Sequence, residues 1–281
     1  MKKIFLVGTL FSSLLFANAS YYTSLPYLGY IKYTGTTAKK DGNVKGVYFS
    51  IFKSPWKVEF DVEGTTITYK DSTADLAQGD FSMFLTYYKG YNLAYNFGVH
   101  YIDSTDLLTD GGQVYKLGML CYKSYEWNKG IDVYYSNYTN LSTSPKLIQI
   151  SPKIGFNFGD YYSSIGSFYV ETKIDYIKVL ENQAINNLSK VYRSIDLTLN
   201  NYNGKFTTSF NGWVGKRSFA VENGGFIVNN IGDEQNGGFK IAEEYKVNKV
   251  QSFKLEYSYT KFKENGNSAT RTYLLSFNYG F

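Results

Sequence analysis

The chain has 281 residues and a formal net charge of +5, and aromatic residues make up 19% of it, with 29 tyrosines and 21 phenylalanines. A single cysteine excludes an intramolecular disulfide framework. The mild positive charge does not suggest a nucleic-acid partner, and nothing along the chain has the composition of a linker between domains.

The first 19 residues are typical of a secretory signal peptide. Lys2 and Lys3 precede an uncharged apolar run that ends at Phe16, and small residues follow at Ala17 and Ala19. The run is several residues shorter than the roughly 20 that a membrane-spanning helix needs. We therefore expect cleavage after Ala19, which leaves one domain over residues 20–281.

The rest of the chain falls into segments in which apolar and polar residues alternate. A period of two indicates β-strands with one apolar and one polar face. The clearest example begins at Trp56, where Trp56, Val58, Phe60 and Val62 alternate with Lys57, Glu59, Asp61 and Glu63. In chain order we predict fourteen strands, at about 27–35, 46–52, 56–63, 81–87, 91–101, 115–121, 131–135, 148–158, 168–174, 191–199, 206–214, 239–245, 253–259 and 272–281.

The connections between these segments indicate the architecture. Short turns, such as those at Gly90 and Gly159, alternate strictly with longer loops, and longer ones come first and last. This order is typical of an up-and-down barrel with periplasmic turns and extracellular loops. The chain is therefore predicted to be all-β, a transmembrane antiparallel barrel of about 14 strands, with 12 or 16 as alternatives. Its tyrosines suit the aromatic girdles of such a barrel.

Four features do not fit the simple pattern. The longest connection, 219–237, contains a possible extra hairpin at 222–225, but we expect it to extend above the bilayer, unless it folds inward as a lid. Glu243 falls on an apolar row, so we expect a bulge there to turn it inward. Pro152 must lie at a bulge or where no ladder hydrogen bond is needed. The spacing of apolar residues over 174–188 is compatible with a helical turn in a loop.

The end of the last strand carries a resemblance. Phe277, Tyr279 and the terminal Phe281 share one face, as in the C-terminal strand that the assembly machinery of bacterial outer-membrane barrels reads. By length, signal peptide and strand number the whole chain resembles the fourteen-stranded monomeric porins typified by porin G. This implies a monomer in a Gram-negative outer membrane, in contact with the bilayer and lipopolysaccharide. Fatty-acid transporters with this strand number carry an N-terminal hatch, whereas only 20–26 precede the first strand here, which argues against hydrophobic substrates.

The polar rows are expected to line the lumen. The predicted cations are Lys32, Lys57, Lys116, Lys153, Lys173, Lys205, Lys240 and Lys254. The predicted acids are Glu59, Asp61, Glu63, Asp132, Glu171, Asp175, Asp196, Glu244 and Glu256. Charges of both signs need water or partners, so the lumen is either wet or filled by ion pairs. Since fourteen strands lie between the eight of filled barrels and the sixteen of open porins, we expect a narrow aqueous passage with weak ion selectivity.

We therefore predict a porin through which small hydrophilic solutes diffuse passively, without a metal, a cofactor or a catalytic activity. A barrel plugged by its own lysine–carboxylate pairs, with a structural or adhesive role, is the alternative. A third possibility is a hydrolase built on His100, the only histidine and a predicted lumen residue, with Asp103 and Ser104 nearby.

Overall fold

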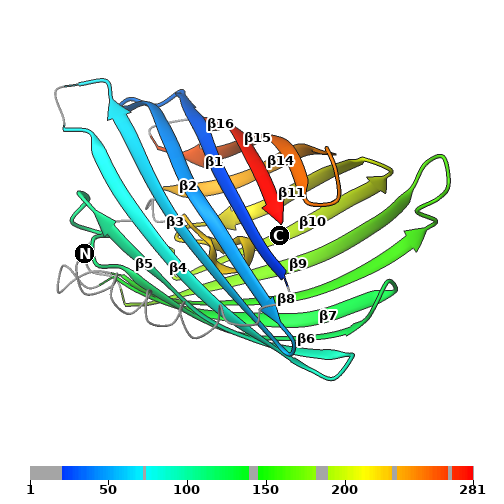
Figure 1. Ribbon diagram of the computed structural model, residues 1–281. Coiled ribbons are helices and arrows are strands. Elements are labelled where there is room, and N and C mark those ends of the chain that lie inside the picture. The colour runs from blue at the N-terminus through cyan, green and yellow to red at the C-terminus, as the bar shows by residue number, and fades with distance from the viewer. Residues whose placement is uncertain are drawn as a thin grey trace.

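The fourteen predicted strands form a closed antiparallel barrel (Figure 1). The computed structural model describes residues 21–71, 74–138, 145–181, 189–229, 233–264 and 268–280. Predicted cleavage residues Ala17 and Ala19, and Phe281 of the predicted assembly signal, lie outside these ranges. The wall consists of β1 (Tyr21–Thr34), β2 (Lys39–Lys53), β3 (Trp56–Tyr69), β4 (Leu76–Lys89), β5 (Leu93–Ser104), β6 (Gln113–Lys123), β7 (Trp127–Asn137), β8 (Lys146–Gly159), β9 (Ser167–Glu181), β10 (Val191–Asn203), β11 (Phe206–Arg217), β14 (Glu234–Lys246), β15 (Gln251–Lys263) and β16 (Ser268–Gly280).

Each wall strand pairs with its neighbours in the chain, and β1 pairs with β16 to close the ring, with Leu28 opposite Leu275. Closure matters because an unpaired strand edge in lipid would leave backbone donors and acceptors unsatisfied. The outer face is apolar, and Leu28, Leu117 and Leu255 are each more than 60% exposed on it. No helix in the described ranges is long and apolar enough to cross a membrane.

Several strands and connections differ from the sequence-based expectation. The strict alternation of connection lengths is wrong, because the β8–β9 turn, 160–166, is longer than the β1–β2 loop, 35–38. β2 begins at Lys39, so most of the expected first polar loop is strand. The expected helical turn is also wrong over 174–181, which belong to β9. The remainder of that stretch, 182–188, lies outside the described residues.

Glu243 and Pro152 show how the barrel accommodates two unfavourable residues. The expected bulge at Glu243 does not form, because its pairing with Thr208 and Leu255 lies in continuous register. Glu243 therefore points outward, where its carboxylate accepts a 2.7 Å hydrogen bond from the Thr208 hydroxyl. Pro152 pairs with Ile131 of β7, while the β8–β9 register is the same before and after it. It thus lies where the ladder can lack one donor.

The connection between β11 and β14 lies inside the barrel. It contains β12 (Val221–Glu222), the 3₁₀ turn η2 (Asn223–Gly225) and β13 (Ile227–Val228), and β12 pairs only with β13. In Figure 1 this yellow segment curls within the ring. The expected extension above the bilayer is therefore wrong, and the extra hairpin forms in the lumen rather than in the wall. We call residues 218–229 the inward segment.

Candidate channel lumen

Arg217, the last residue of β11, anchors the base of the inward segment. It is 1% exposed, and its guanidinium lies 4.1 Å from the centre of the Trp213 ring. One of its nitrogens, Nη2, bridges Asp175 of β9, at 3.0 Å, and Asp196 of β10. The other, Nη1, contacts Glu222 of the inward segment at 3.1 Å. A planar, permanently charged guanidinium suits such multiple pairing, so Arg217 ties the inward segment to two wall strands.

Side chains around this anchor complete a buried polar network. Lys173 Nζ lies 3.1 Å from Asp175 and 2.9 Å from Asp196, so the two acids share two cations. Gln149 of β8 donates to the Val221 carbonyl and accepts from the Val221 amide, both at 2.8 Å. This two-way hydrogen bond satisfies both backbone groups of a fully buried residue, which would otherwise cost stability. The first half of the inward segment is therefore fixed against β8, β9 and β10.

A hydrophobic core fills the lumen beside these strands. Phe219 and Ala220 of the inward segment pack into it, together with Tyr138 from the β7–β8 loop. Wall residues and partly buried neighbours complete it: Ile102, Leu147, Ile177, Tyr192, Leu108, Val179 and Val228. Burial raises the pKa of the Tyr138 phenol, which therefore stays neutral at physiological pH. Apolar side chains therefore fill the long-loop end of the lumen along β5 to β10.

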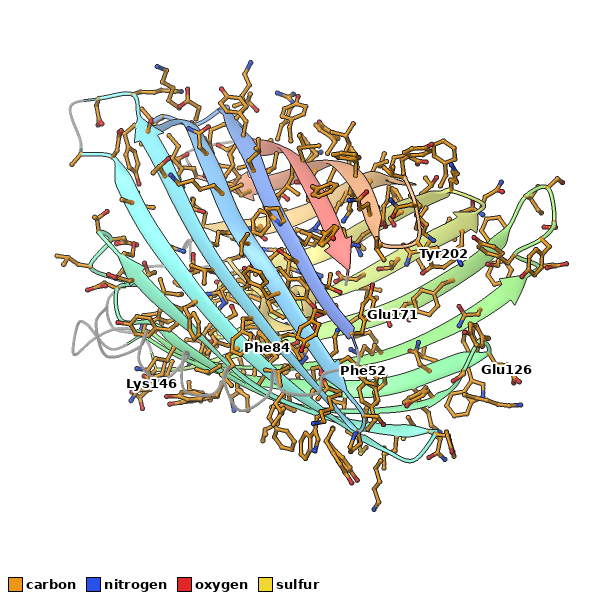
Figure 2. The ribbon with its side chains drawn as sticks, viewed as in Figure 1. Phe52, Phe84, Glu126, Lys146, Glu171 and Tyr202 are labelled. Atoms are coloured by element: carbon orange, nitrogen blue, oxygen red, sulfur yellow. The ribbon has the colours of Figure 1, made fainter. Side chains whose placement is uncertain are left out.

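The tip of the inward segment reaches the opposite wall. The Phe226 ring packs edge-on against Phe84 of β4, with centroids 4.5 Å apart, and against Tyr48 of β2, at 5.4 Å. Phe84 lies between two glycines: a side chain on Gly98 of β5 or on Gly225 would overlap its ring. Figure 2 shows Phe84 within the outline of the barrel. The inward segment therefore crosses the lumen and makes contacts on both sides.

A cavity of about 370 Å³ remains on the other side of the inward segment, along β1 to β4 and β14 to β16. Polar groups from several strands line it, including Glu63, Asp80, Lys240 and Glu256. Phe226 to Asn229 of the inward segment form part of its wall. The lumen is therefore divided into a filled side and an open side.

Most of the side chains predicted to line the lumen lie on the inward face. They are Lys57, Glu59, Asp61, Glu63, His100, Lys116, Asp132, Lys153, Glu171, Lys173, Asp175, Asp196, Lys240, Glu244, Lys254 and Glu256. Lysine–carboxylate pairs join many of them, as where Lys153 lies 2.8 Å from Asp132 and Lys240 lies 3.1 Å from Glu256. Local ion pairs thus cover much of the lumen surface, whereas Asp61, Glu63, Glu171 and Glu244 accept hydrogen bonds from hydroxyl groups.

Two predicted lumen residues lie elsewhere. Lys32 shares the outer face of β1 with Leu28 and Tyr30, because the inward positions of this strand belong to Tyr27, Ile31 and Tyr33. Lys205 lies in the β10–β11 turn, where its ammonium sits 5.8 Å from the Tyr245 ring centre on the outer face. Assigning these two lysines to the lumen was wrong.

His100 contacts a serine and an aspartate, but not the two expected from the sequence. Its Nδ1 lies 2.7 Å from Ser82 Oγ, and its Nε2 lies 3.0 Å from Asp80 Oδ1. Asp103 is exposed, and the Ser104 hydroxyl accepts a hydrogen bond from the backbone amide of Asp106. The order serine, histidine, aspartate is that of a hydrolytic triad, yet Ser82 is only 1% exposed. The buried hydroxyl suits a role in joining β4 to β5.

The sequence interpretation missed the residues that hold the inward segment. Arg217 is one of only three arginines in the chain, and it directly precedes the longest connection. This position was the one sequence feature that could have marked it as an anchor for that connection. Phe84 and Phe226 read as ordinary apolar residues, since their contact joins segments far apart in the chain. The hydrogen bonds between Gln149 and Val221 likewise join residues that lie far apart in the sequence.

Comparisons with known proteins bear on the fold. No family model and no curated protein matches the chain. The toluene transporter TbuX of Ralstonia pickettii superposes with a TM-score of 0.59 at 9% identity, covering 94% of this chain and 90% of that one. The monoaromatic hydrocarbon channel CymD gives 0.60 at 7% identity, with coverages of 96% and 91%. A bacterial polysaccharide outer membrane secretin gives 0.59 at 11% identity, with coverages of 92% and 98%.

The chain has the fold of an outer-membrane β-barrel. At identities of 7–11%, structural similarity to these proteins establishes the fold but not the solute. The lining of the lumen must indicate the solute.

Proposed function

We propose that the protein is an outer-membrane channel through which small hydrophilic solutes diffuse passively. The observation that carries the proposal is the division of the lumen: the inward segment occupies the side along β5 to β10 and leaves a cavity along β1 to β4 and β14 to β16. Ionisable and hydroxyl groups line much of this cavity, and such a surface favours water over a dry interior. The inward segment then sets the width of the passage.

The proposal includes the protein's setting. Export by the predicted signal peptide places it in the outer membrane, where its apolar outer face contacts lipid and lipopolysaccharide. Phe277 and Tyr279 lie on the outer face of β16, where the assembly machinery would meet them during insertion. We take the working unit to be a monomer.

Single-channel recording tests the proposal. The refolded protein in a planar bilayer should give discrete current steps whose size rises with salt concentration, because ions cross a water-filled path. A silent bilayer, with heat-modifiable gel mobility confirming a folded barrel, would contradict it.

A plugged surface barrel is the second candidate, and one observation favours it. The hydrophobic core around Tyr138 and Phe219, together with the Arg217 network, fills part of the lumen with buried side chains. If the remaining cavity is also closed, the same silent bilayer would support this candidate.

A further inference from the structure

The lysines on the open side of the lumen already have acidic partners. Lys57 lies 2.8 Å from Glu59, and Lys240 and Lys254 lie 3.1 and 3.0 Å from Glu256. Lys39, at the long-loop end, pairs with Asp233. These cations are therefore committed to carboxylates within the protein and offer no free site for an anion.

Two carboxylates on β3 differ, because hydroxyl groups are their partners. Tyr27 Oη lies 3.0 Å from Asp61 and 2.8 Å from Glu63, and Thr65 donates to Glu63 at 3.1 Å. Within the described part of the chain, no lysine or arginine lies within 4.0 Å of either carboxylate. Asp80, which lines the cavity together with Glu63, accepts a hydrogen bond from Gln78 and contacts His100. This wall thus gathers three carboxyl groups, and among the described residues the cationic candidate within 4.0 Å of them is the His100 imidazole beside Asp80, although the whole chain is formally positive.

The same cavity has an apolar wall that the alternation pattern did not predict. Ile31, Tyr33, Ile67 and Leu76 cluster on the inward face of β1, β3 and β4. Phe226 of the inward segment and Trp213 add aromatic rings to the lining. Its volume of about 370 Å³ lies within the range of small-molecule sites, which combine mostly apolar walls with a few placed polar groups.

We infer that the cavity binds a small organic cation, a protonated amine carried on a short apolar or aromatic body. The ammonium would give Glu63 and its neighbour Asp61 the cationic partner that the protein does not supply, in a confined site where charge-assisted hydrogen bonds are strong. The apolar part of the solute would displace water from the apolar wall of the cavity. The rings of Phe226 and Trp213 in the lining would also attract its cation. Uptake of this solute class rests on the proposed channel, whereas binding does not.

The test compares three probes of one shape. Titration calorimetry of the folded protein in detergent micelles is run with 2-phenylethylamine, the neutral 2-phenylethanol and the anionic phenylacetate. The amine should bind about tenfold or more tightly than either of the others, because it alone brings a charged hydrogen-bond donor to the carboxyl groups. Equal binding of alcohol and amine, tighter binding of phenylacetate, or no binding of any probe would overturn the inference.

A pair of matched variants locates the site. Glu63→Gln keeps the side-chain shape and removes the charge, so it should weaken amine binding by about tenfold and leave alcohol binding unchanged. The control is Glu171→Gln, because Glu171 also accepts a tyrosine hydroxyl, from Tyr169 at 2.6 Å, yet does not line the cavity. Figure 2 shows Glu171 away from Phe84. Equal amine affinity in Glu63→Gln and wild type would contradict the assignment.

Calorimetry tests the cation site, and bilayer recording tests the channel, so each proposal can fail separately. Calorimetry needs no current, so a silent bilayer leaves the binding result intact. Current steps without amine preference would keep the channel and remove the cation site. If Glu63→Gln loses its heat-modifiable mobility, the variant has not folded. The comparison of the three probes on the wild-type protein then still tests whether the cavity prefers a cation.

Discussion

Replacing Arg217 with alanine is expected to destabilise the barrel by about 3–5 kcal/mol in the free energy of unfolding. The change removes one cation from between Asp175 and Asp196, which are almost fully buried, and leaves Lys173 to serve both. It also removes the contact to Glu222, so the inward segment loses its charged tie to the wall. Urea unfolding of the folded protein measures the first effect, and single-channel recording should show larger, fluctuating currents.

The neighbouring residue provides the control for this prediction. Lys216 pairs with Glu234 at 2.9 Å, but its side chain is 63% exposed on the outside of the molecule. Exposed ion pairs are screened by solvent and contribute little to stability, so Lys216→Ala should unfold and conduct almost as the wild type does. Equal stability of the two variants would show that the Arg217 network does not hold the inward segment.

Removing most of the inward segment should open the lumen. Replacement of residues 219–229 by a Gly-Ser-Gly linker deletes Phe219, Ala220 and Phe226, which fill one side of the barrel and touch the other. A fourteen-stranded wall without this filling should enclose a wider water path, so single-channel conductance should rise at least about twofold. The ladder between β11 and β14 does not depend on these residues, so the barrel should still fold.

A shortened turn at the opposite rim is the matched control for the deletion. Residues 161–165 lie between β8 and β9, and Tyr162 there is 92% exposed. Their replacement by the same linker should leave conductance unchanged. Unchanged conductance in the 219–229 variant as well would mean that this segment does not limit the passage.

The alternation of residue types was enough to predict the barrel wall, because one face of each strand meets lipid. On β3 the charged row from Lys57 to Glu63 faces inward as expected. The same rule failed on β1, where Ile31 and Tyr33 face a lumen that is itself partly apolar, and Lys32 therefore faces out. A rule that equates apolar with lipid-facing cannot detect an apolar surface inside the barrel.

The inward segment could not be placed from local sequence. The connection that contains it is polar around residues 232–236, which favours water, and water lies both above a bilayer and inside a channel. Its position depends on contacts between distant parts of the chain, such as Val221 with Gln149 and Phe226 with Tyr48. Such pairs leave no periodicity in one sequence, whereas the two-residue period of a strand does.

Chemical cross-linking tests the path of the inward segment most directly. Phe84→Cys and Phe226→Cys are combined in a Cys121→Ser background, since the two rings lie 4.5 Å apart and Cys121 is the only native thiol. A short bis-maleimide should join the two cysteines within one chain of the folded barrel. The control pair, Phe84→Cys with Phe206→Cys on the outer face, should stay unlinked. Single modification of both sites without a cross-link in the first pair would contradict a segment that crosses the lumen.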